Sequence, residues 1–106
     1  MANNYKNSKV DLSSTSITTL YTCPASTTAL VKSILVSEDS GNADTITLTI
    51  TSGSDVFSLY KVKAVGANGT VELLTAPLVV QASEILKVTA ATANRLHVVA
   101  SYLEIT

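Results

Sequence analysis

The 106-residue chain has no tryptophan, one cysteine, one histidine, two prolines and four glycines. Because Cys23 is the only cysteine, the chain cannot form an internal disulfide or a metal cluster built on several thiolates. A single histidine, His97, likewise excludes a site with several histidine ligands from one copy. The sequence therefore disfavours function through a disulfide or a bound metal ion. We interpret Cys23 as a small buried hydrophobic residue.

Charge is also scarce. Charged residues make up 14% of the chain against 46% hydrophobic residues, and the net charge is -1. The lysines and the arginine are scattered, whereas nucleic-acid binding needs clustered cations that displace counterions from phosphates. No apolar run reaches the roughly 20 residues of a membrane span. We expect neither a nucleic-acid nor a membrane partner, and the low charge suits a protein that works within an assembly.

Threonine, serine, valine, isoleucine and leucine dominate the chain, a composition that favours strands. The clearest strand is 45–51, where Ile46, Leu48 and Ile50 alternate with threonines and so define one buried face. A turn at 52–55 predicts a hairpin with the next strand. The other predicted strands are 10–13, 17–23, 29–37, 56–62, 70–74, 78–80, 85–90 and 96–105. We expect an all-β fold, a single antiparallel β-sandwich of jelly-roll or Ig-like type with about eight short strands.

The chain has the size of one domain. Residues 1–8 are polar and carry no pattern, so we interpret them as an N-terminal arm that precedes a sandwich domain at 9–106. They lack the apolar stretch of a signal peptide, which predicts synthesis in a cytoplasm. In an assembly an arm can reach a neighbouring molecule, and Tyr5 and Lys6 are therefore candidate partner contacts.

Catalysis would depend on His97, which alternation places on the opposite face from Leu96 and Val98. That position predicts a surface or interface histidine rather than a general base. The chain also lacks a Gly-x-Ser-x-Gly motif and a phosphate-binding glycine loop. We expect no enzyme and no cofactor; an enzyme would need His97 in a pocket beside a carboxylate and a nucleophile.

The densest group of oxygen ligands is the segment 38–44, with Glu38, Asp39, Asn42 and Asp44. Such residues can hold calcium, a hard cation that takes several oxygens, but their spacing is not that of an EF-hand. Asp, Ser, Gly and Asn are also the residues of an ordinary turn. We favour a turn without a metal, and we take Asp39, Asn42 and Asp44 as further candidate partner contacts.

The stretch 14–34 holds, in order, a Thr-rich strand, a Tyr-Thr-x-Pro motif, a Ser-Thr-Thr turn and a Val/Ile-rich strand. This order resembles small virion structural proteins of tailed bacteriophages, above all those of marine and cyanobacterial phages. The resemblance covers about residues 9–105, with Cys23 where a plain apolar residue is usual and Ser26 where glycine is common. The other segments that fit the pattern are 71–74, 77–80, 85–90 and 96–105.

The resemblance implies a virion component that is present in many copies after synthesis in the cytoplasm of the bacterial host. The expected role is an oligomeric capsid decoration (cement) protein. Its partners would be further copies of itself, with a trimer as one arrangement, and other virion proteins such as the major capsid protein. A tail, neck or fibre structural protein is the alternative. A carbohydrate- or receptor-binding module is another class, and it would need aromatic side chains and amides converging near the 38–44 loop.

Overall fold

The computed structural model describes residues 2–106, and all of its regular structure is β-strand. The all-β prediction is therefore confirmed, and the boundaries agree within a few residues for most strands. The nine strands are β1 (Asn3–Asp11), β2 (Thr18–Thr22), β3 (Thr28–Glu38), β4 (Asp44–Ser52), β5 (Asp55–Val65), β6 (Thr70–Glu72), β7 (Leu78–Val80), β8 (Ile85–Ala90) and β9 (Leu96–Ile105).

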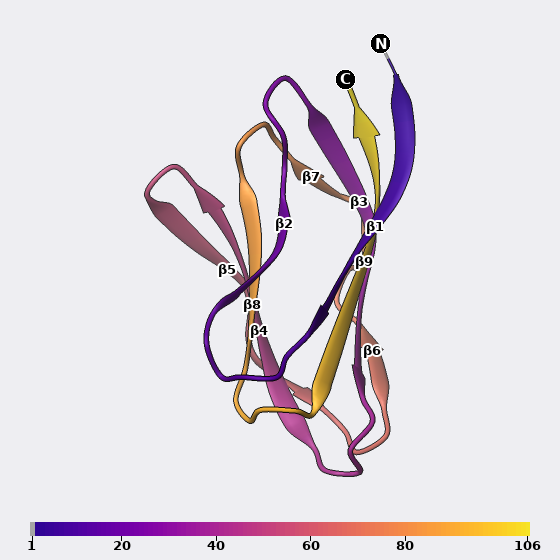
Figure 1. The fold of residues 1–106 in the computed structure, drawn as a ribbon, viewed down its shortest axis with the longest axis vertical. Coiled ribbons are helices and arrows are strands. Elements are labelled where there is room, and N and C mark those ends of the chain that lie inside the picture. The colour runs from indigo at the N-terminus through magenta and orange to yellow at the C-terminus, as the bar shows by residue number, and fades with distance from the viewer. Residues whose placement is uncertain (1) are drawn as a thin grey trace.

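The strands form two antiparallel sheets that pack face to face (Figure 1). Sheet A has the order β1-β9-β3-β6, with β7 also paired to β3, and sheet B has the order β2-β8-β4-β5. This order is that of a jelly roll, in which the chain crosses repeatedly between the two sheets. The short strands β6 and β7 share one edge of sheet A, so nine strands occupy the places of eight. The predicted hairpin is confirmed as β4–β5.

The core lies between the sheets and follows the alternation in the sequence. Ile46 and Leu48 of β4 are fully buried, while Thr45, Thr47 and Thr49 alternate with them on the outer side of sheet B. Cys23 is buried as expected. The largest fully buried apolar side chains are Leu12, Ile34, Ile46, Leu48, Leu73, Leu86 and Leu96.

Strand β1 corrects the expected N-terminal arm. Residues 3–8 are the first part of β1, which pairs with β9 in continuous register from Asn3 opposite Ile105 to Asp11 opposite His97. Both termini therefore lie at the same end of sheet A (Figure 1). Backbone pairing orders this polar segment, and backbone pairing leaves no mark in a side-chain pattern. Met1 lies outside the described residues.

Glu72 explains why the predicted strand 70–74 ends early. Its carboxylate accepts hydrogen bonds from the backbone N–H of Ile34 (2.7 Å) and of Leu74 (3.1 Å), and from the Ser33 hydroxyl. Burial alone would raise the pKa of Glu72, but these hydrogen bonds lower it below its usual value. In the gap between β6 and β7 the carboxylate thus binds the N–H of Ile34, while one backbone bond to β3 remains, from the N–H of Leu73 to the carbonyl of Ile34 at 2.9 Å.

Candidate functional site: the outer face of sheet A

An apolar row crosses the outer face of sheet A. Tyr5 lies opposite Leu103, Leu103 opposite Leu30, and Leu30 opposite Val79, so the row joins β1, β9, β3 and β7. Tyr5 is 76% exposed and Val79 is 51% exposed, while the two leucines are half-buried. Cross-strand neighbours on one face lie in contact distance, so these four side chains form a continuous surface.

A second row on the same face carries opposite charges at its two ends. Lys9 on β1 lies opposite Val99, Val99 opposite Leu35, and Leu35 opposite Glu72 on β6. Leu35 is 41% exposed, and both charged residues are exposed. This row therefore has an apolar middle with a cation at one edge of the sheet and an anion at the other. Between the two rows lies a polar one, made of Asn7, Ser101 and Ser33.

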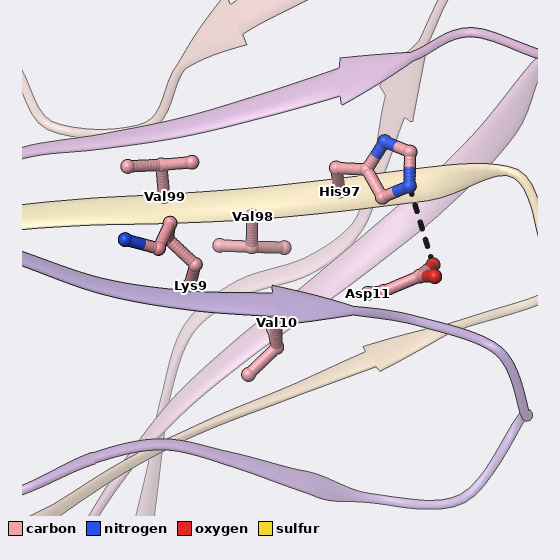
Figure 2. Close-up of a pocket in the computed structure, with 6 residues that line it drawn as sticks. All are labelled: Lys9, Val10, Asp11, His97, Val98 and Val99. Carbon is pink, nitrogen blue, oxygen red and sulfur yellow. Dashed lines mark ion pairs between the residues drawn. The ribbon is translucent and has the colours of Figure 1, made fainter.

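A shallow depression of about 410 Å³ lies on this face where β1 and β9 run side by side (Figure 2). His97 stands at one end of it, with Nε2 3.3 Å from a carboxylate oxygen of Asp11 and Nδ1 3.4 Å from one of Asp39. Both ring nitrogens thus face carboxylates, so the imidazole links β9 to β1 and to the loop after β3. The residues that line the depression are Lys9, Val10, Asp11, His97, Val98 and Val99.

The two candidate contacts in β1 point to opposite sides of the sheet. Tyr5 lies on the outer face, and the ammonium of Lys32 sits 5.4 Å from its ring centroid, within cation–π range. Lys6 instead forms an ion pair with Glu104, with Nζ 2.8 Å from Oε1. The hydrogen bond to Glu104 and its negative charge raise the pKa of Lys6. Tyr5 is available to a partner, whereas Lys6 is occupied within the fold.

The partner of Lys6 belongs to a polar cluster inside the sandwich. The Tyr21 hydroxyl donates to Glu104 Oε2 at 2.5 Å, and the Tyr21 and Tyr102 rings are 4.2 Å apart. Hydrogen bonds from Lys6 and Tyr21 lower the pKa of Glu104, and burial raises the pKa of Tyr21. Sequence reasoning missed this cluster. Alternation along β9 does hold a signal for it, because Glu104 shares the inner face with Ala100 and Tyr102.

Glu38 organises the loop that carries the other candidate contacts. The Glu38 side chain is 2% exposed and accepts backbone hydrogen bonds from Ser40 (2.7 Å), Gly41 (3.0 Å) and Asn68 (3.0 Å). Burial alone would raise the pKa of Glu38, but these bonds and one from the Ser40 hydroxyl lower it to about 2. The carboxylate therefore ties the loop at 38–44 to the turn that contains Asn68.

The remaining oxygen ligands of the loop point in different directions. Asp39 is exposed and faces His97, Asn42 is exposed, and Asp44 is 7% exposed and accepts a hydrogen bond from the backbone N–H of Thr92 at 3.1 Å. Asp44 is thus a structural residue, which corrects its assignment as a partner contact. Across residues 2–106, no group of three or more His, Cys, Asp or Glu side chains is arranged to hold a metal ion.

The β4–β5 hairpin is a second exposed apolar area, which the sequence did not single out. Val56 is 62% exposed and Phe57 55% exposed, on the opposite sheet from the apolar row. Val62, 61% exposed, has a φ of 55°, a left-handed conformation that is strained for a β-branched residue. Register shifts interrupt the β4–β5 pairing on either side of Leu48, and such irregularities discourage edge-to-edge pairing along β5.

No protein-family model, curated protein or solved structure matches the chain. Residues 2–106 hold no helix that is long and apolar enough to span a membrane.

Proposed function

We propose that the protein is a structural component of a tailed-phage particle, an oligomeric capsid decoration protein that acts through its surfaces. The observation that carries the proposal is the apolar row of Tyr5, Leu103, Leu30 and Val79 across the outer face of sheet A. Soluble proteins rarely leave a contiguous apolar surface uncovered unless a partner binds there. The polar row of Asn7, Ser101 and Ser33 separates the two rows of this face, and protein–protein interfaces usually combine apolar contacts with hydrogen-bonding groups in this way.

Two further features support a virion role. The jelly roll occurs in viral capsid domains, although lectins and other proteins share it, so this support is an analogy of fold. The stretch 14–34 supplies the resemblance to tailed-phage virion proteins, and it forms the whole of β2 and most of β3. In this structure those strands belong to different sheets, so the resembling segment spans the core of the sandwich.

A decoration protein needs one surface for its own copies and another for the capsid. This chain offers two separate exposed apolar areas, the outer face of sheet A and the β4–β5 hairpin with Val56 and Phe57. The tightly packed sandwich between them acts as a rigid plate, because its core is filled by interlocking aliphatic side chains. Contacts at both surfaces would add binding energy between capsid subunits without any chemical step.

The test is to purify particles of the phage whose genome encodes the chain and to determine their composition by quantitative mass spectrometry. We expect the chain to co-sediment with the particles in a fixed, high ratio to the major capsid protein. Electron cryomicroscopy would then show its density on the capsid; density at the neck, tail or fibre would replace the decoration role with the alternative position. Particles that lack the chain would refute the proposal.

A further inference from the structure

We propose that the outer face of sheet A binds the same face of a second copy, across a two-fold axis that runs parallel to the strands. This inference rests on the proposed function in one respect, that the face is a contact surface. It adds that the molecule bound there is a second copy of the chain. A closed two-fold pair is the commonest symmetric arrangement of identical chains, and it requires a surface that is complementary to itself.

Lys9 and Glu72, the charges at the two ends of the second row, meet that requirement. Rotation about a two-fold axis parallel to the strands reverses the strand order of the partner's sheet relative to the first. Each row of one subunit therefore faces the same row of the partner, read in the opposite direction. Lys9 at the β1 edge would therefore lie over Glu72 of the partner subunit, and Glu72 over the partner's Lys9. The row that begins at Lys9 thus gains two opposite-charge contacts at the rim, where such pairs set orientation and register.

The apolar residues match under the same operation. Val99 would lie over the partner's Leu35, and Leu103 over the partner's Leu30, so aliphatic side chains meet along the centre. Tyr5, the largest exposed side chain of the face, would lie over the partner's Val79, one of the smaller ones. Two sheets that pack in this aligned manner interdigitate at a separation of about 10 Å.

The area is sufficient for a specific interface. Sheet A is four strands wide, at about 4.8 Å per strand. Strand β1, the shortest of its three long strands, has nine residues at about 3.3 Å each. The face therefore covers roughly 550 Å² per subunit, and a pair would bury about 1,100 Å² in total, just above the ~1,000 Å² expected of a biological contact. An interface of this size predicts a reversible dimer whose population rises with concentration.

The first experiment measures the mass of the purified full-length protein by light scattering over a range of concentrations. We expect about 22 kDa, twice the 11.1 kDa of one chain, at high concentration. Val79→Lys, which puts a charge into the apolar row, should raise the dimer dissociation constant at least about tenfold. Val56→Lys is the matched control, an exposed valine on the opposite sheet, and should leave the dissociation constant unchanged. Circular dichroism verifies that each variant folds.

A second pair of variants tests the register. When Leu35→Cys and Val99→Cys proteins are mixed under mild oxidation, the cross-linked product should be mainly the heterodimer, because each position faces the other across the axis. Lys9→Glu, an exposed change that should not disturb the core, should also weaken the dimer by placing a carboxylate opposite Glu72 of the partner subunit.

Several results would overturn the inference: a monomer at every concentration, a trimer, or equal effects of Val79→Lys and Val56→Lys. These results are separable from the fate of the proposed function, because dimerisation is measured without any particle. A monomeric protein that is nevertheless found on capsids would refute the two-fold contact alone. A dimer that is absent from purified particles would refute the virion role alone.

Discussion

Glu104 is the residue on which the inner polar cluster depends. It is 5% exposed, and its carboxylate is satisfied by the Lys6 ammonium and the Tyr21 hydroxyl, which come from β1 and β2. A buried carboxylate that loses such partners retains the full cost of its desolvation. The cluster therefore couples three strands that are far apart in sequence.

Replacing Tyr21 by phenylalanine should destabilise the protein. The variant keeps the ring contact with Tyr102 but removes the hydroxyl that donates to Glu104. A hydrogen bond to a charged group contributes about 1.5–3 kcal/mol, so urea unfolding should show a loss of that size. Tyr60→Phe, at a half-buried position on β5, is the control and should change stability by less than about 0.5 kcal/mol. Equal effects of the two changes would contradict this role of the Tyr21 hydroxyl.

Replacing Val62 should stabilise the folded protein. Its left-handed backbone conformation, with φ of 55°, brings the branched side chain close to its own backbone, whereas asparagine tolerates that region. Val62→Asn should raise the free energy of unfolding by about 1 kcal/mol, measured by urea titration. Val56→Asn makes the same change at another exposed position of β5 and should bring no such gain. A destabilised Val62→Asn variant would refute the proposed strain.

At the scale of elements, β1 is part of the sandwich and not an appendage. Deleting residues 1–8 removes six of the nine β1 residues that pair with β9 and leaves Glu104 without Lys6. At about 0.5–1.5 kcal/mol per backbone hydrogen bond, the deletion should cost at least about 3 kcal/mol of stability. Thermal and urea unfolding measure it, with deletion of residues 1–2 as the mild control. A truncated protein with unchanged stability would restore the arm interpretation.

The strands differ in how far their sequence reveals them. The strand at 45–51 could be predicted because Ile46 and Leu48 are fully buried and Ile50 is half-buried against the same core, and burial on one face leaves an alternating pattern. Strand β1 could not, since residues 3–8 hold their place through backbone pairing to β9. Strand β6 ends before its expected boundary because the Glu72 carboxylate binds the N–H of Ile34, and that contact depends on where β3 lies.

At the scale of the whole molecule, three glutamates make the fold sensitive to acid. The pKa of Glu38 is lowered to about 2, and those of Glu72 and Glu104 are lowered too, because the folded protein hydrogen-bonds their ionised forms. In the unfolded chain they return to their usual value near 4.5, so below that pH the unfolded chain binds more protons. Stability should therefore be fully present above about pH 5 and fall as the pH decreases from about 4.5 towards 2.

Urea unfolding at about pH 7, 4 and 3 measures this dependence. Glu38→Gln removes one titrating group, so its loss of stability between the highest and lowest pH should be smaller than that of the parent protein. The variant will itself be less stable at neutral pH, because the amide presents an N–H₂ to backbone donors. If both proteins lost the same free energy on acidification, Glu38 would not be a source of the acid sensitivity.

The sequence alone determined the fold class, most strand positions and the burial of Cys23, because these follow from local alternation and composition. It also supplied Tyr5, Asp39 and Asn42 as candidate partner contacts, and all three are exposed. Only the tertiary structure decided that Lys6 and Asp44 serve the fold, and that Tyr5 and Val79 share one surface. Those facts depend on which strands become neighbours and in which register. Strand order in a jelly roll joins segments nearly the whole chain apart, and a local pattern carries no record of that pairing.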